Sequence, residues 1–193
     1  MHTQKATRIK QKGSREQGTT RLFIAAEIPG EIKEQLSIRI RQYATYISRA
    51  ITPENWHMTF LFIGMVDGLP NPPEALVQEL PQAFFPTITL THIGRGQAPG
   101  QLWAYAKPTA WLKTIRQQLQ ERVVTTLPDW RSKKQPENFI PHIKLADLRE
   151  RSVSKFVADS PCLVTWPVKQ LFLYNSKVYW GERKYDAVGK IVL

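Results

Sequence analysis

The sequence predicts an α+β fold of two pseudo-symmetric lobes, each an antiparallel sheet with helices, that face each other across a central groove. The first observation is a repeated order of elements: a strand, a helix and a strand that begins with histidine occur early in the chain and again late. The second is periodicity, because the helical segments repeat apolar residues every three or four positions and the strand segments alternate. A pseudo-twofold arrangement would bring the two histidine strands together at the groove.

The chain of 193 residues is long enough for one domain with a real core. Residues 1–20 are polar and basic, so we expect a disordered arm there, followed by a single bilobal domain over 21–193. The domain is expected to start with a buried strand over 21–28. Pro29 then opens a helix over 30–47. The apolar side of that helix comprises Ile32, Leu36, Ile40, Tyr43 and Ile47.

The later elements are separated by connections rich in Pro, Gly and polar residues. The second half is expected to repeat the strand over 101–108, the helix over 109–126 and the histidine strand from His142. The other expected elements are a short helix from Pro72–Pro73 to before Pro81, a strand over 87–96, a basic loop over 127–137, a short helix near 152–159, and strands around 163–174 and 183–192.

The stretch ENWHMTFLFIG, residues 54–64, contains the first candidate site. With a two-residue period, one face of this strand carries His57, Thr59, Leu61 and Ile63. The other face is wholly apolar and is predicted to lie in the core: Trp56, Met58, Phe60 and Phe62. A single strand histidine is more often packed or hydrogen-bonded than catalytic, so the interpretation depends on a second strand of this kind.

That second strand lies in NFIPHIKLADLR, residues 138–149. His142 and Lys144 share one face, and Ile143 and Leu145 share the other. The two histidine strands belong to segments far apart in the sequence, and such segments can meet in space. Two strands with this pattern in one chain are far more specific than one.

Two imidazoles that face one groove suit proton transfer, because near neutral pH one can accept a proton while the other donates one. Cleavage of a phosphodiester needs this division, since the attacking oxygen loses a proton and the leaving oxygen gains one. Thr59 and Lys144 would donate to the non-bridging phosphate oxygens. We assign His142 as the base on water and His57 as the acid on the leaving oxygen, with these roles exchanged in the reverse reaction.

Other kinds of site are disfavoured. Two histidines without a carboxylate partner make a poor metal site, and neither H-x-x-x-H nor H-E-x-x-H occurs, so we expect no metal and no cofactor. The chain has no P-loop and no G-x-S-x-G elbow. The glycine-rich segment over 94–100 does not fit G-x-G-x-x-G and is expected to be a hairpin-type loop.

The charge favours a polyanionic partner. The formal net charge is +11, and the excess is carried by the body of the chain as well as by the arm. A solvated basic surface is the alternative explanation. The single cysteine, Cys162, excludes an internal disulfide, and the sequence has no secretory signal and no transmembrane segment. We therefore expect a cytoplasmic monomer that does not bind membranes, whose arm and RSKK segment, residues 131–134, contact the phosphates of a nucleic acid.

The two histidine motifs and their surroundings resemble the two-histidine (2H) phosphoesterase superfamily, and within it the RNA 2′,3′-cyclic phosphodiesterases formerly called 2′-5′ RNA ligases. RLFIAAEIP is similar to the opening strand of that family, ENWHMTFLFIG to its first H-x-T-x motif, and QLWAYAK to its central strand. FIPHIKLA resembles the context of its second motif, and LFLYNSKVYWGERKY its L-Y-x-S…G…Y ending. The resemblance covers about residues 21–193.

The resemblance implies an enzyme, a metal-independent hydrolase that opens the 2′,3′-cyclic phosphate ends of RNA, or a cyclic nucleotide, to a 2′-phosphate. It also implies 2′-5′ ligation as the same chemistry in reverse. His57, Thr59 and His142 match the motifs directly. Lys144 stands where the second motif has Thr or Ser, and Asp147 stands where the family strand often has an arginine.

Arg149 is close to that position and is predicted as a further phosphate ligand. The departures leave a second hypothesis open, which is a catalytically weak RNA- or nucleotide-binding module that retains the two-histidine groove. A test of turnover on a 2′,3′-cyclic nucleotide separates the two.

Overall fold

The computed structural model describes residues 20–66, 74–80, 86–97, 100–127, 130, 139–150, 160–179 and 182–193. Its elements are β1 (Thr20–Glu27), α1 (Gly30–Ile40), η1 (Arg41–Tyr43), β2 (Ile47–Ala50), η2 (Pro53–Asn55), β3 (His57–Val66), η3 (Glu74–Val77), β4 (Thr87–Arg95), β5 (Gln101–Ala106), α2 (Ala110–Thr126), β6 (His142–Leu148), β7 (Ser160–Pro167), β8 (Gln170–Tyr179) and β9 (Glu182–Val192). The predicted α+β class is confirmed. The arm before Thr20, the RSKK segment and the helix expected near 152–159 lie outside the described residues.

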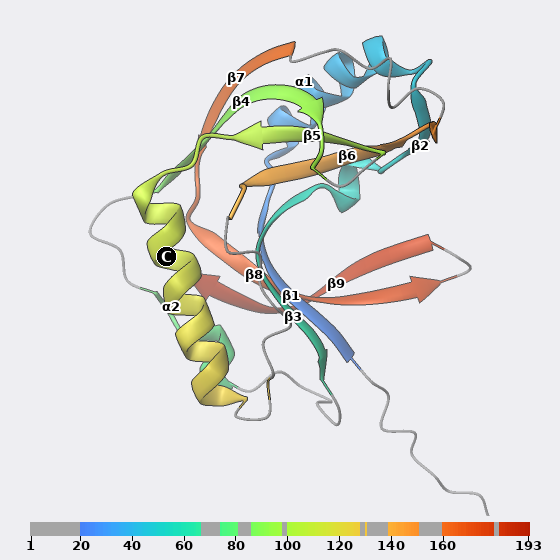
Figure 1. Cartoon of the computed structure of the whole chain (residues 1–193). Helices are drawn as coiled ribbons and strands as arrows, with labels where there is room; N and C mark the ends of the chain where they lie inside the picture. The colour runs from blue at the N-terminus through green and yellow to red at the C-terminus, as the bar shows by residue number, and fades with distance from the viewer. Residues whose placement is uncertain are drawn as a thin grey trace, which may run out of the picture.

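The described strands form one antiparallel sheet in the order β7-β4-β5-β6-β3-β1-β8-β9, with β2 paired to β6 (Figure 1). From the centre outward, β6, β5, β4 and β7 on one side correspond to β3, β1, β8 and β9 on the other. In each half the histidine strand is innermost, and the strand that precedes the helix lies next to it. The repeated element order in the sequence therefore reappears as a symmetric strand order.

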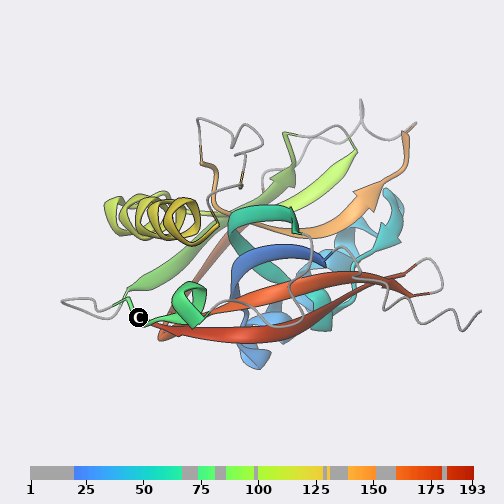
Figure 2. The same ribbon diagram turned by 90° about the horizontal axis from the view of Figure 1, so that it is seen from below.

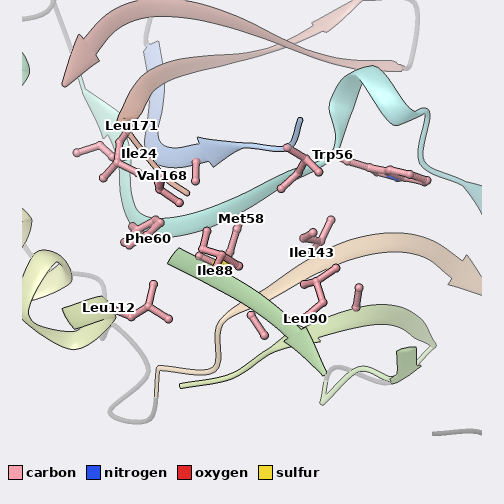
Figure 3. Close-up of a cluster of buried hydrophobic side chains, with 14 of the residues drawn as sticks. Ile24, Trp56, Met58, Phe60, Ile88, Leu90, Leu112, Ile143, Val168 and Leu171 are labelled. Atoms are coloured by element: carbon pink, nitrogen blue, oxygen red, sulfur yellow. The ribbon is translucent and has the colours of Figure 1, made fainter. Parts of the chain in front are cut away.

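The two halves meet where β3 pairs with β6. In that pairing Met58 lies opposite Ile143, and both side chains are fully buried. Each of these residues directly follows a histidine of the motif. Figure 3 shows both side chains within the cluster of core residues between the two halves.

A single hydrophobic cluster spans both halves of the sheet. Helix α2 packs against β3 through a face of buried residues at helical spacing, and Trp111 of α2 lies 6.3 Å from Phe60 between ring centroids. Figures 1 and 2 both show α2 at one side of the molecule, with the turn end of the β8–β9 hairpin projecting away from it. No helix in the described part of the chain has the length and apolar character needed to span a bilayer. The buried residues of α2 are Leu112, Ile115, Leu119 and Val123.

Two expected elements differ from the structure. The helix expected over 30–47 ends at Ile40, because Ile47 starts β2 and pairs with Leu148 of β6. Strand pairing overrides helical periodicity there, as tertiary contacts often do. The single strand expected around 163–174 is two strands, β7 and β8, which separate after Pro167.

The core face of β3 also differs from the prediction. The pairing with β1 skips Phe60, so this strand carries a bulge, and the alternation of faces reverses after it. As a result Leu61 and Ile63 are buried, whereas Phe62, which was expected in the core, is 53% exposed. Phe62 therefore lies on the same face as His57, and its predicted place in the core was wrong.

Strand β6 has an equivalent irregularity. Its pairing with β5 skips Leu145, and both Leu145 and Ala146 are buried. The shift puts Asp147 on the face that carries His142 and Lys144. Phe62 and Asp147 each follow their histidine by five residues, so the two halves repeat this feature as well.

We expect Leu61→Ala to lower the free energy of unfolding by about 2–4 kcal/mol, because it removes a fully buried side chain. The matched change Phe62→Ala should cost less, about 1 kcal/mol, because about half of that side chain is already exposed. Urea denaturation of both variants measures the difference. A larger loss for Phe62→Ala would contradict the reversal of faces.

Candidate functional site

The central strand pair brings four predicted site residues to one face of the sheet. Met58 and Ile143 lie opposite each other and point into the core. In an extended strand the neighbours of a core residue point to the other face. His57 and Thr59 flank Met58, and His142 and Lys144 flank Ile143. All four side chains are partly exposed, as a site that admits substrate requires.

The two imidazoles have matching hydrogen bonds. His57 Nδ1 lies 2.7 Å from the carbonyl oxygen of Asn55, and His142 Nδ1 lies 2.8 Å from that of Ile140. Each acceptor is the carbonyl two residues before its histidine. A carbonyl oxygen can only accept, so Nδ1 carries the proton in both rings. The tautomer is therefore fixed, and Nε2 of each ring is the atom available for proton transfer.

His57 lies in a group of aromatic rings. Its ring centroid is 4.9 Å from that of Phe23 and 4.9 Å from that of Tyr185, which it meets edge-on. Tyr174 stacks on Phe23 at 5.2 Å. The pKa of His57 is lowered to about 4, chiefly by burial; the bond to the Asn55 carbonyl opposes this effect and the charge of His142 adds to it. The effect of His142 on His57 agrees with their placement on adjoining strands.

His142 stacks on Trp103 of β5, with ring centroids 3.5 Å apart and planes 13° from parallel. Gly96 also lies against the indole, because a Cβ added there would come within 3.0 Å of three atoms of the ring system. Trp103 Nε1 also donates to Gln101 Oε1 at 2.7 Å. Burial holds the pKa of His142 below its ordinary value, and the bond to the Ile140 carbonyl opposes that effect.

These pKa values have a chemical consequence. Both lie below 6.5, so both imidazoles are neutral at pH 7 and both Nε2 atoms are proton acceptors. An acid–base pair needs one protonated ring. An anion bound between the rings would favour the imidazolium form and would raise the pKa of either ring. The site is therefore suited to take up a proton together with an anionic ligand.

Lys144 is paired with a carboxylate. Its Nζ lies 2.6 Å from Asp147 Oδ1, and Arg49 of β2 donates from Nε and Nη2 to Asp147 Oδ2 at 3.0 and 2.7 Å. Partial burial alone would raise the pKa of Asp147, but the hydrogen bonds and charges of Lys144 and Arg49 together hold it below its ordinary value. Asp147 thus compensates the charge of Lys144 beside His142, and burial is what lowers the pKa of His142.

Arg149 lies just past the end of β6. Its Nε donates to the carbonyl of Ile47 at 3.0 Å, and its backbone N–H donates to that of Tyr46. One of its guanidinium donors thus binds β2, and its role as a phosphate ligand stays a prediction. Among the described residues, no group of three or more His, Cys, Asp or Glu side chains could hold a metal ion.

The sequence did not single out Arg49, Trp103 or Tyr185 as site residues. The helix expected over 30–47 overlapped the start of β2, the strand that carries Arg49. The sequence therefore revealed neither that strand nor the pairing of Arg49 with Asp147. Trp103 and Tyr185 lie in the QLWAYAK and LFLYNSKVYWGERKY segments, which the resemblance had already marked. The signal for those two was present, but nothing in the sequence placed them against the histidines.

No protein-family model and no curated protein sequence matches this chain. Solved structures do. E. coli LigT in complex with NADP+ has a TM-score of 0.67 and 24% identity, over 91% of this chain and 99% of that one. A structure described as a phosphoesterase has a TM-score of 0.67 and 25% identity, over 91% and 99%. The chain has the fold of the 2H phosphoesterases.

The protein TT0787 of Thermus thermophilus shares this fold with a TM-score of 0.67 and 23% identity, over 90% of this chain and 97% of that one. The predicted resemblance to the 2H phosphoesterase superfamily is thereby confirmed for the fold. The structural similarity covers about nine tenths of this chain.

The depressed pKa of His57 predicts a pH-dependent loss of stability. The unfolded chain binds this proton near pH 6.5 and the folded chain near 4, so stability is full above 6.5 and falls as the pH drops toward 4. The loss should reach at most about 3 kcal/mol. Denaturant unfolding at several pH values should show a smaller loss for His57→Gln. Equal pH slopes in the two proteins would contradict the buried neutral state.

Proposed function

We propose that this protein hydrolyses the 2′,3′-cyclic phosphate ends of RNA to 2′-phosphates by paired-histidine catalysis. The observation that carries the proposal is the matched geometry of the two rings. His57 and His142 lie on one face of adjoining strands, each with Nδ1 donating to a backbone carbonyl. Phosphodiester opening needs one base and one acid on opposite sides of phosphorus, which two such rings can supply.

The steps follow from this placement. The cyclic phosphate, a monoanion, binds between the rings and raises the pKa of His57, which takes up a proton. His142 Nε2 accepts a proton from water, and the water oxygen forms a bond to phosphorus as the bond from phosphorus to O3′ breaks. His57 Nε2–H donates its proton to O3′. The product is a 2′-phosphomonoester with a free 3′-hydroxyl.

Thr59 and Lys144 would stabilise the negative charge on the non-bridging oxygens during this displacement. The hydroxyl is a neutral donor from the first half, and the ammonium is a charged donor from the second. If the 5′-hydroxyl of an RNA replaces water, the same proton transfers form a 2′-5′ bond. No step requires a metal ion.

Nucleotide recognition is supported by the similar structures. Those of E. coli LigT hold NADP+, ATP, 3′-AMP or phosphate, so a protein of this fold accommodates nucleotides. The net charge of this chain favours a polyanion in the same way. Its monomeric state and cytoplasmic location stay predictions from the sequence.

The binding-module alternative also has one observation in its favour. Asp147 holds the ammonium of Lys144 at 2.6 Å and brings a negative charge to the face where a phosphate would bind. A bound phosphate must share the Lys144 ammonium with that carboxylate or displace the carboxylate. Sharing would weaken the stabilisation of negative charge in the transition state. Intact histidine geometry favours the enzyme over this alternative.

We expect His57→Ala and His142→Ala each to lower turnover of adenosine 2′,3′-cyclic phosphate by about 10²–10⁴-fold, because each removes one proton transfer. Lys113→Gln, at an exposed position of α2, is the control and should retain activity. Chromatography separates the 2′-phosphate product from its 3′ isomer. Near-normal rates in either site variant would exclude the paired mechanism, and no turnover by the wild type would favour the binding module.

Lys144 and Asp147 should have opposite effects on phosphate affinity. Lys144→Thr removes a cation and should weaken binding of inorganic phosphate by about tenfold, whereas Asp147→Asn releases that cation and should tighten binding by a similar factor. Titration calorimetry measures both. If Lys144→Thr has no effect, Lys144 is not a ligand and Thr59 is the remaining side-chain donor of the central pair.

A further inference from the structure

The sheet face beyond His57 carries arginines at defined positions. Arg21 stands two residues before Phe23 on β1, and Arg183 stands two residues before Tyr185 on β9. Both rings contact His57, at 4.9 Å between centroids. Strand alternation therefore puts both arginines on the face of the histidines, and both are exposed.

Two hydrogen bonds fix the place of Arg183. Its Nη1 donates to Ser176 Oγ at 3.3 Å, and Ser176 lies opposite Tyr185 in the β8–β9 pairing. Its carbonyl accepts from Asn55 Nδ2 at 3.2 Å. The carbonyl of that same Asn55 accepts from His57 Nδ1. The start of β9 is thereby tied to the turn that orients the catalytic ring.

Arg49 approaches from the other half of the sheet. Asp147 holds its guanidinium, yet the side chain remains 67% exposed. Burial raises the pKa of Tyr185, but the charges of Arg183, Arg21 and Arg49 all oppose that effect, so all three act on one phenol. The Lys177–Asp186 pair lies on the opposite face of the hairpin, because these residues alternate with Ser176 and Tyr185.

We propose that Arg21, Arg49 and Arg183 form a second phosphate subsite, which binds the phosphate on the 5′ side of the terminal nucleotide. The identity of its ligand rests on the proposed function, because that function supplies the RNA substrate. It would make the enzyme select the end of an RNA chain over a single cyclic nucleoside phosphate.

The chemistry of the three residues supports a phosphate ligand. Guanidinium groups bind phosphate oxygens in a fixed, bidentate geometry. The three residues bring positive charge to one face of the sheet, Asp147 compensates part of it at Arg49, and a bound anion would compensate more of it. The cluster starts at Tyr185, in ring contact with His57, so its ligand would neighbour the scissile phosphate. In an RNA chain the phosphate on the 5′ side of the terminal nucleotide lies next to the terminal cyclic phosphate in this way.

The first test measures binding and does not depend on turnover. We expect wild-type protein to bind adenosine 2′,5′-bisphosphate at least about tenfold more tightly than adenosine 2′-monophosphate in calorimetric titrations. Arg21→Gln and Arg183→Gln should each reduce this ratio about threefold or more, and the double variant should bring it near one. Lys113→Gln, the same loss of charge on α2, should keep the wild-type ratio.

Two binding results would overturn the proposal. One is equal affinity of the wild type for the two nucleotides, or no binding of either. The other is an equal loss of affinity for both nucleotides in the arginine variants, because the arginines would then act on the 2′-phosphate itself. A ratio that falls with rising salt would support the proposal, and a ratio independent of salt would oppose it.

Turnover separates this proposal from the proposed function. The value of kcat/KM is compared for adenosine 2′,3′-cyclic phosphate and its 5′-phosphorylated form, and a preference for the latter that Arg183→Gln reduces supports the subsite. Hydrolysis of both at equal efficiency would reject the subsite and keep the reaction. Hydrolysis of neither, with the binding ratio intact, would reject the reaction and keep the subsite.

Discussion

The burial of Met58 against Ile143 is the constraint on which the site depends. These two residues form the pairing that joins the two halves of the sheet, and neither side chain is exposed. Because each directly follows a histidine, their burial turns both histidines to the opposite face. One apolar contact at the centre of the core therefore positions two groups that are 85 residues apart in sequence. The halves cannot slide by one residue without moving a histidine into the core.

Burial of the rings has a second effect, on their protonation. His57 lies among aromatic rings and His142 stacks on Trp103, so both lose hydration that would favour the imidazolium. The carbonyls that accept from Nδ1 offset part of that loss but leave both pKa values low. Two neutral rings provide a base but no acid. The acid would arise when an anion binds, so the site would become competent only with its phosphate in place.

The sequence predicted the elements around the histidines well, because alternation and the repeated element order are local signals. It placed His57 and Thr59 on one face of the first histidine strand and His142 and Lys144 on one face of the second, as the structure does; the structure joins these strands in one sheet. It misplaced Phe62 because a bulge reverses the faces of β3, and a two-residue period cannot reveal where a bulge falls. It treated Asp147 as a departure from a family pattern, while the structure gives that carboxylate two cationic partners.

The partners of Asp147 show why such features need a structure. Arg49 reaches it from β2, a strand that helical periodicity had concealed, and Lys144 reaches it because the irregularity at Leu145 reverses the face of β6. The carboxylate occupies the position that Phe62 occupies in the other half, so the symmetric halves place a charge network on one side of the histidines and an aromatic ring on the other. Under the proposed function this difference would suit an asymmetric substrate, because a phosphate chain and a sugar would present different chemistry to the two histidines. The near-symmetry of the fold thus gives the two rings matching hydrogen bonds, and the residues five positions after each histidine make the two sides of the pair chemically different.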